Sequence, residues 1–113
     1  VSLVSYLQAD CSDAESSAQE IWNLTGSGTR AYDLDVAKKY AKKVMDAAED
    51  AHRSALDCSC SKSKKTKEFA SLTYKYAKWA YEATNLSDCH LKLVQARSGS
   101  LETESSASDC ENN

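Results

Sequence analysis

Very little in this sequence would interrupt a helix. The 113-residue chain has no proline and only three glycines, at positions 26, 28 and 99. Proline and glycine are the residues that most often end helices, and a chain of this length forms one domain. We therefore expect an all-α protein, a small disulfide-bonded helical bundle of about four helices.

One stretch, from Lys67 to Tyr81, holds five of the nine aromatic side chains. On a helix its apolar residues form two rows at i, i+3 and i+4 spacing. The first row contains Phe69, Leu72, Tyr76, Ala80 and Ala83, and the second contains Ala70, Tyr74, Ala77 and Tyr81. A helix that is apolar on two faces needs neighbours on both, so this pattern predicts a central helix whose rings pack in the core.

The other helices follow from spacing and capping residues. The first is expected from Ser2 to Asn23, with Val4, Leu7 and Cys11 on its inner face and the glycines at 26 and 28 ending it. Asp33 or Asp35 caps the second, which runs to Leu56. Its inner seam is almost entirely alanine: Ala37, Ala41, Val44, Ala48, Ala51 and Ala55.

The last two helices have capping serines or threonines. Ser63 or Thr66 is expected to cap the aromatic helix, which ends near Asn85. Ser87 caps a short fourth helix through Ala96 that Gly99 closes. Residues 1–99 then form the bundle, and residues 100–113 form an acidic, serine-rich tail that is mobile unless Cys110 ties it down.

Five cysteines in so short a chain indicate an oxidising compartment. In an up-and-down bundle, Cys58 and Cys60 lie in a loop at the end where the first helix begins. The fourth helix brings Cys110 back to that end, so we expect Cys11 and Cys110 each to bond one of the loop cysteines. Cys89 remains as the odd thiol, either in an intersubunit bond or buried and free.

Three further features agree with a secreted chain. The sequons at Asn23 and Asn85 suit a secretory route, and the start at Val1 without a methionine fits a processed or trimmed chain. No apolar run reaches the roughly 18 residues that a membrane span needs.

The basic residues all lie between Arg30 and Arg97, flanked by acidic ends, which indicates internal or intersubunit charge pairing rather than nucleic-acid binding.

Metal ligands are sparse in the sequence. The Cys58-x-Cys60 pair is tighter than a standard zinc pair, and no second such pair exists. His52 lies on the lysine-rich second helix, whereas His90 stands at a predicted helix start beside Cys89. We therefore take His90 as the candidate zinc ligand, in a site shared across a dimer.

Catalytic signatures are absent from the sequence: it has no glycine-rich phosphate loop, no GxSxG turn and no HExxH. We expect no enzymatic activity. The interleaved tyrosines and lysines offer different chemistry, because Lys78 is one helical turn from both Tyr74 and Tyr81. An oxidised tyrosine accepts a neighbouring lysine amine, although lysine stems also simply cover aromatic rings.

The chain as a whole is helical, proline-free and rich in cysteine, lysine and tyrosine, and in this it resembles the ranasmurfin family, blue proteins of tropical frog foam nests. That resemblance implies a helical homodimer, lysine tyrosylquinone cross-links formed from the chain itself, a blue chromophore bridging the subunits, and a bound zinc. It implies a role in foam mechanics, adhesion or colour. By proximity, the candidate residues are Tyr74, Lys78, Tyr81 and His90.

Three functions compete at this level. The first is a non-enzymatic secreted structural protein of a biofoam or extracellular matrix, acting as a covalently stabilised dimer. The second is a secreted helical binding module that carries small apolar ligands between its helices or acts as an effector. The third is an inhibitor of an extracellular enzyme.

Overall fold

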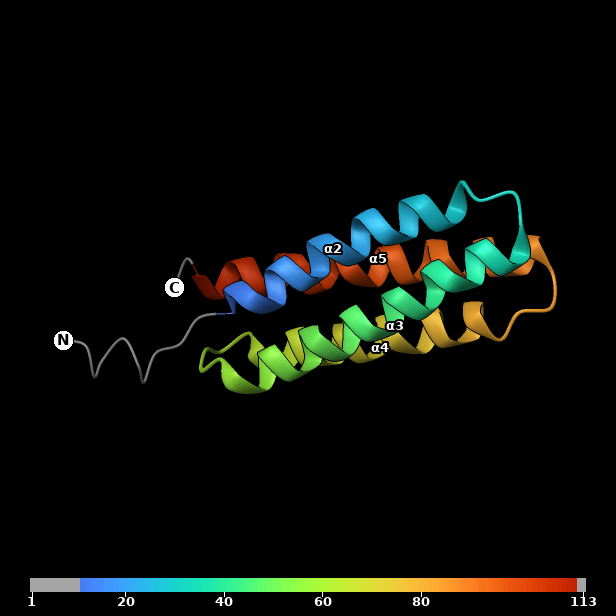
Figure 1. Cartoon of the computed structure of the whole chain (residues 1–113). Helices are drawn as coiled ribbons and strands as arrows, with labels where there is room; N and C mark the ends of the chain where they lie inside the picture. The colour runs from blue at the N-terminus through green and yellow to red at the C-terminus, as the bar shows by residue number, and fades with distance from the viewer. Residues whose placement is uncertain (1–10, 112–113) are drawn as a thin grey trace.

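A computed structural model describes residues 11–111, and this part of the chain contains four helices and no strand (Figure 1). The helices are α2 (Ser12–Thr29), α3 (Leu34–Asp57), α4 (Ser63–Tyr81) and α5 (Leu86–Glu111). The all-α prediction is therefore confirmed. The first ten residues, which include the expected start of the first helix with Val4 and Leu7, lie outside the described part.

The helices run alternately up and down, joined by short turns (Figure 1). Each packs against its neighbours in the chain, and α2 closes the ring by packing against α5. The beginnings of α2 and α4 therefore meet the ends of α3 and α5 at one end of the bundle. This is the up-and-down four-helix arrangement that short loops favour.

Two helix starts carry side-chain caps. Oδ1 of Asp33 accepts hydrogen bonds from the backbone N–H groups of Asp35 and Val36, at 2.7 and 3.4 Å, as predicted for the start of α3. Oδ1 of Asn85 accepts from the N–H of Asp88 at 2.8 Å, so Asn85 rather than Ser87 caps α5. The expected cap of α4 by Ser63 or Thr66 is wrong, because that helix begins after Lys62 without a side-chain cap.

The prediction that glycine ends the first helix at Asn23 is wrong, because α2 continues to Thr29. Both glycines of this segment are buried and helical. A Cβ placed on Gly28 would stand 2.7 Å from Cδ1 of Leu93 and 3.1 Å from Cβ of Tyr40. Gly28 is therefore a contact point of α2 with α5 and α3 rather than a helix stop.

The prediction that Gly99 closes a short fourth helix is also wrong, since α5 runs unbroken to Glu111. A Cβ on Gly99 would lie 2.5 Å from Oγ1 of Thr73 and 3.4 Å from its Cα. The missing side chain thus lets α4 and α5 approach closely. Residues 100–111, expected to form a separate tail, are the last turns of this helix.

Buried hydroxyl groups accompany this C-terminal half of α5. Ser100, Thr103 and Ser106 are buried, and each hydroxyl donates to a carbonyl one turn earlier, at 2.7, 2.8 and 2.9 Å. Ser106 Oγ also lies 2.9 Å from Oγ1 of Thr66 on α4. These small polar side chains are hydrogen-bonded inside the bundle, where they allow close helix packing.

The core consists mainly of small residues. All six positions predicted for the seam of the second helix are buried, so that prediction is confirmed. On α4, however, the buried face is not aromatic but consists of Thr66, Ala70, Thr73, Ala77 and Ala80. Closely spaced helices leave no room for rings between them, so the predicted aromatic core is wrong and the rings lie along the edges of α4.

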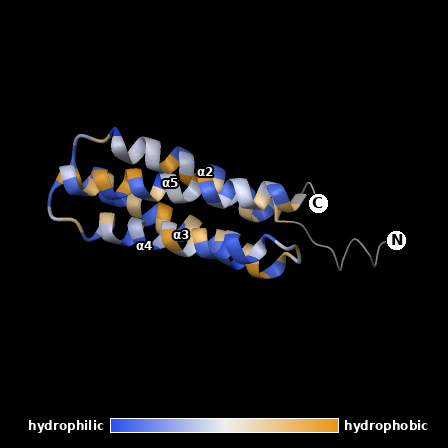
Figure 2. Ribbon diagram, turned by 180° about the vertical axis from the view of Figure 1, so that it is seen from behind, coloured by the Kyte–Doolittle hydropathy of each residue, from blue (hydrophilic) through white to orange (hydrophobic). Residues whose placement is uncertain are grey.

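Each helix has both hydrophobic and hydrophilic residues, which alternate along its ribbon (Figure 2). Among residues 11–111, none of the helices combines the length and the apolar character that crossing a membrane requires.

Candidate functional site

Two disulfides close the end of the bundle where the described chain begins. They join Cys11 to Cys58 and Cys60 to Cys110, so the predicted pairing of both terminal cysteines with the loop cysteines is confirmed. Each bond joins the beginning of one helix to the end of the next in space. The disulfides therefore clamp α2 to α3 and α4 to α5.

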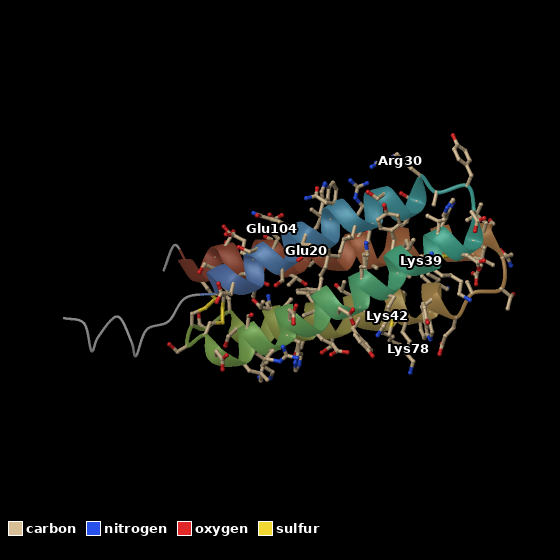
Figure 3. All side chains as sticks on the ribbon, viewed as in Figure 1. Glu20, Arg30, Lys39, Lys42, Lys78 and Glu104 are labelled. Carbon is tan, nitrogen blue, oxygen red and sulfur yellow. A yellow bond between two sulfur atoms is a disulfide. The ribbon has the colours of Figure 1, made fainter. Side chains whose placement is uncertain are left out.

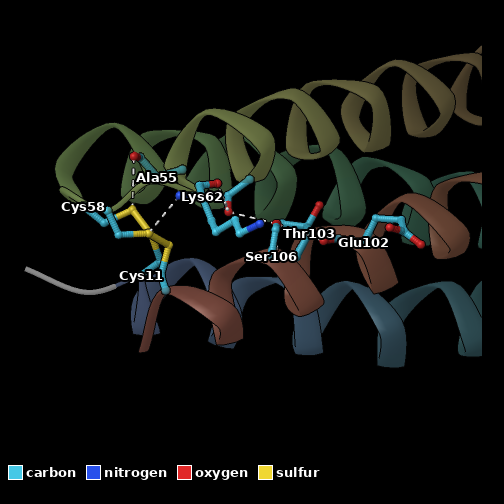
Figure 4. The surroundings of a disulfide bond; sticks show 10 residues. Cys11, Ala55, Cys58, Lys62, Glu102, Thr103 and Ser106 are labelled. Atoms are coloured by element: carbon cyan, nitrogen blue, oxygen red, sulfur yellow. Dashed lines mark hydrogen bonds between the residues drawn. A yellow bond between two sulfur atoms is a disulfide. The ribbon is translucent and has the colours of Figure 1, made fainter. Parts of the chain in front are cut away.

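The second disulfide lies close to the Cys11–Cys58 bond, whose surroundings Figure 4 shows. The sulfur atoms of Cys11, Cys60 and Cys110 all lie within 4.8 Å of one another, and Cys58 is bonded to Cys11. Within the described part of the chain, these three cysteines are the residues that the fold brings close enough together to share a metal ion. The sequence spacing alone gave no sign of it.

Cys89 is a free cysteine with no exposed surface. Burial raises the pKa of the Cys89 thiol above the ordinary value of 9.0; nearby Lys38 lowers it and Asp88 raises it further. Of the two alternatives left by the sequence, this position favours a buried free thiol over an intersubunit bond.

The expected cross-link residues on α4 do not converge. Tyr74 is half-buried against the core, Tyr81 is 42% exposed, and Lys78 is exposed. In Figure 3 the Lys78 side chain points away from the bundle. No cation–π contact of the described residues joins Lys78 to Tyr74 or Tyr81, although helical spacing suggested it.

Instead, lysines of α3 lie over tyrosine rings. Lys38 Nζ stands 5.8 Å from the centre of the Tyr81 ring across the α3–α4 boundary. Lys43 Nζ stands 5.4 Å from the Tyr40 ring, one turn away on its own helix. The sequence could have suggested the local pair, whereas the pairing of Lys38 with Tyr81 depends on how two helices face each other.

The indole rings are covered in the same way. Trp79 lies between two lysines, with Nζ of Lys75 and Lys92 at 4.9 and 5.5 Å from the ring centre, and meets Tyr76 edge-on. The Arg97 guanidinium lies 3.5 Å above the Trp22 ring. Aromatic rings on this surface are therefore regularly covered by cations.

His90 is half-buried at the start of α5. Its Nε2 lies 2.9 Å from the carbonyl oxygen of Ala31, so Nε2 carries the proton that it donates. Only Nδ1 is then open to a metal. Within residues 11–111, His90 belongs to no group of three potential ligands, so one chain does not supply a zinc site there.

A groove of about 350 Å³ runs between α3 and α4. Its lining combines Ala48, Leu56 and Ala70 with Tyr74 and the polar side chains of Glu49, His52, Arg53 and Ser71. A second hollow shares His52 and Leu56 and extends the groove towards Lys64 and Lys67. The groove thus has apolar side chains in its lining and a rim of mixed charge, with Arg53, Lys64 and Lys67 against Glu49 and Glu68.

Charge is distributed unevenly between the helices. Helix α2 contains acidic residues but no lysine or arginine. Helix α4, which lies diagonally opposite α2 in the bundle, contains mostly lysines among its charged residues. The salt bridges recorded for residues 11–111 are exposed pairs within α3, Lys42–Asp46 and Arg53–Asp50. The expected pairing of the acidic ends with the basic middle is not among them.

Comparison with protein-family models, curated proteins and solved structures found no match to this chain.

Proposed function

We propose that this chain is a non-enzymatic structural protein of a secreted biofoam or extracellular matrix, stabilised by quinone cross-links between lysine and tyrosine and acting as a homodimer. The observation that carries the proposal is the Lys38–Tyr81 contact, an amine held 5.8 Å from the centre of a 42% exposed phenol ring. The ranasmurfin-like character of the chain is a second support.

The cross-linking chemistry needs only dioxygen as oxidant. One O₂ converts the Tyr81 phenol to an ortho-quinone and leaves one water. The neutral Lys38 amine then adds to a ring carbon and gives an aminocatechol. A further half equivalent of O₂ takes two electrons and two protons from this product, giving the aminoquinone and a second water. The net product contains one oxygen more and four hydrogens fewer than the separate side chains.

The position of the pair favours this addition. Lys38 is half-buried and lies on α3, whereas Tyr81 ends α4. The bond would therefore fasten two helices at the end of the bundle opposite the disulfides. The fold holds the amine beside the ring, so the two groups do not have to meet by diffusion. The effective concentration of the nucleophile is therefore raised.

Secretion and dimerisation form part of the proposal. The two disulfides suit an oxidising compartment. The acidic α2 of one copy can face the basic α4 of another, a self-complementary arrangement in a two-fold dimer. Tyr32, which is 98% exposed, is open to a lysine of a second copy.

Adsorption to an air–water interface has its own support. Leu91, Val94 and Leu101 are exposed on α5 at a spacing that places them on one side of the helix. Their exposure gives the surface of a rigid bundle an apolar stripe. Zinc at His90 would need ligands from a second chain, and the cross-linking steps above do not involve it.

The test is intact-mass spectrometry of the fully reduced protein after exposure to air and a phenol oxidase. We expect the mass change of one added oxygen and four lost hydrogens, and a peptide from α3 joined to one from α4. Lys38→Arg keeps the charge but removes the amine, so it should abolish this product. Tyr81→Phe should do the same.

Lys78→Arg is the matched control and should leave the product unchanged. If Lys78→Arg abolishes it and Lys38→Arg does not, the pairing along α4 is correct and the pairing across helices is wrong. If the reduced mass of the natural protein equals that of the bare sequence, the cross-linking function is wrong altogether.

A binding module is the second candidate, and the groove between α3 and α4 favours it. Its volume of about 350 Å³ suits a small ligand, and Arg53, Lys64 and Lys67 on its rim can pair with an anionic head group. An anionic naphthalene sulfonate should bind there, and Arg53→Gln with Lys67→Gln should weaken binding. Lys42→Gln, remote from the groove lining, should not.

A further inference from the structure

The strongest unused feature of the molecule is the group of four sulfur atoms at the disulfide end. Three of them, from Cys11, Cys60 and Cys110, lie within 4.8 Å of one another, and the fourth is bonded to Cys11. The four cysteines come from three separate parts of the chain. Helix packing, rather than a local motif, brings them together.

The spacing of three of the sulfurs is close to that of a metal–thiolate centre. In a tetrahedral site with metal–sulfur bonds of about 2.3 Å, neighbouring sulfurs stand about 3.8 Å apart. The sulfurs of Cys11, Cys60 and Cys110 lie within 4.8 Å of one another, and Cys58 stands outside that group but is bonded to Cys11. The Cα atoms are 5.2 and 5.7 Å apart across the two disulfides, so the backbones of the four cysteines already stand close together.

The tight Cys58-x-Cys60 spacing is not an obstacle in this fold. Cys58 has extended backbone angles, φ −89° and ψ 147°, and side chains two positions apart in an extended segment point to the same side. Both loop cysteines therefore face Cys11 and Cys110. Because the four cysteines come from three chain segments, the spacing within one segment does not decide whether they can hold zinc.

One backbone donor reaches the cluster, and three of its cysteines are buried. The backbone N–H of Lys62 donates to Sγ of Cys60 at 3.2 Å, the kind of outer contact that orients a metal ligand. Cys11 immediately precedes α2 and Cys60 lies just before α4, whereas Cys58 follows the end of α3 and Cys110 lies in the last turn of α5. Two positive and two negative ends of helix dipoles therefore meet at the cluster, and their effects on sulfur charge oppose each other. Cys11, Cys58 and Cys110 are buried, which limits access of water.

We propose that Cys11, Cys58, Cys60 and Cys110, once both disulfides are reduced, form a tetrathiolate site for one soft divalent cation such as Zn²⁺ or Cd²⁺. Two equivalents of an external dithiol supply four electrons and four protons, and each becomes a disulfide. The cation then displaces the four thiol protons. An oxidising disulfide such as that of glutathione reverses the electron flow and releases the metal.

The site goes beyond the structural function proposed above and does not depend on it. The helices at this end of the bundle are then linked either by the two disulfides or by the bound metal. A chain that is not yet oxidised would be held in its folded arrangement by the cation, because the binding free energy of a structural metal site is available to folding.

The test is a Cd²⁺ titration of the full chain, reduced with a phosphine that is then removed without air. We expect a thiolate-to-cadmium charge-transfer band in the near ultraviolet that saturates at one Cd²⁺ per chain. Helical circular dichroism should rise in parallel if the reduced chain has unfolded. The oxidised protein should show no band, and glutathione disulfide should release the metal from the loaded form.

Single substitutions identify the ligands. Cys60→Ser and Cys110→Ser should each lower Cd²⁺ affinity by more than about 100-fold, since loss of a ligand exceeds the loss caused by removing an outer contact. Cys89→Ala, at the other end of the bundle, should leave affinity and stoichiometry unchanged. Equal affinity in Cys60→Ser, dependence on Cys89, or binding without one-to-one saturation would overturn the proposal.

Discussion

At the scale of single residues, this bundle depends on side chains that are small or absent. Gly28 and Gly99 stand where a Cβ would collide with the neighbouring helix, whereas a Cβ on Gly26 would make ordinary contacts with the guanidinium groups of Arg30 and Arg97. All three are in helices with ordinary negative φ. The same residue type therefore has opposite effects on stability at different positions.

Replacing Gly99 by alanine should destabilise the protein by about 1–2 kcal/mol, because overpacking costs more than the roughly 1 kcal/mol that alanine gains in helix propensity. The new Cβ would stand 2.5 Å from Oγ1 of Thr73. Gly26→Ala meets its nearest atom at an ordinary 3.4 Å and should stabilise by about 0.5–1 kcal/mol. Urea unfolding of both variants measures the difference.

Thr73→Ala provides the control for this clash. It removes the hydroxyl oxygen that the new methyl group would meet, so the double variant with Gly99→Ala should lose less than the sum of the two single losses. Equal stability of Gly99→Ala and Gly26→Ala would show that the close approach at Gly99 does not constrain the fold.

Cys89 gives the protein a dependence on alkaline pH. Its thiol stays neutral in the folded state because burial raises its pKa, whereas the unfolded thiol ionises near 9.0. Above that pH the unfolded chain binds fewer protons, so stability should fall by up to about 1.4 kcal/mol per pH unit until the folded thiol also ionises. Chemical denaturation between pH 8 and 11 measures this change.

Cys89→Ala isolates the contribution of this thiol from every other effect of pH on stability. The difference in unfolding free energy between the natural chain and the variant should be constant below pH 8 and decline above pH 9. A difference that does not change over the whole range contradicts a buried neutral thiol.

At the scale of elements, α5 is the helix that sequence patterns describe least well. Its second half is rich in serine and glutamate and contains Gly99, a composition typical of a tail. It is helical in the bundle because its hydroxyls bond to the preceding turn and its end is tied to the start of α4 by Cys110. Tertiary contacts thus override weak intrinsic propensity.

Removing the Cys60–Cys110 bond by a double serine substitution should therefore loosen the end of α5. The bond spans 50 residues, and the chain-entropy model assigns such a loop about 4 kcal/mol. Hydrogen exchange should become faster in residues 100–111 before it does so in the rest of the bundle. Mass spectrometry of the exchanged peptides resolves the two regions.

The matched control is removal of the Cys11–Cys58 bond, which spans 47 residues and so has nearly the same loop entropy. That variant should lose a similar unfolding free energy but keep the protection of residues 100–111. Equal exchange patterns in the two variants would show that α5 does not depend on its own disulfide.

At the scale of the whole molecule, stability is divided between a core of small side chains and a covalent frame. The buried apolar residues are mostly alanines, with Ile21, Val44 and Leu93 among the few larger ones. Alanine burial contributes little, since each buried methylene group adds only about 0.8 kcal/mol. The disulfides, and the cross-link proposed at the opposite end, therefore contribute an unusually large part of the free energy of unfolding.

Full reduction should accordingly remove most of the stability of the chain. Two bonds at about 4 kcal/mol each are comparable with the total of about 5–15 kcal/mol that domains possess. We expect the melting temperature to fall by tens of degrees, or the chain to unfold, in a metal-free reductant. Thermal melts followed by circular dichroism, with and without phosphine, measure this; an unchanged melting temperature would mean that the alanine core suffices.

The sequence by itself determined the helical class, the alanine seam, a cap at Asp33 or Asp35, and the bonding of Cys11 and Cys110 to the loop cysteines, because periodicity, capping and an up-and-down chain path are nearly local properties. Which loop cysteine each of them bonds was decided by the tertiary structure. Only the tertiary structure decided that glycines lie inside helices, that rings lie on edges rather than in the core, and that Lys38 rather than Lys78 meets Tyr81. Those outcomes depend on how closely two backbones approach, which is a property of pairs of helices.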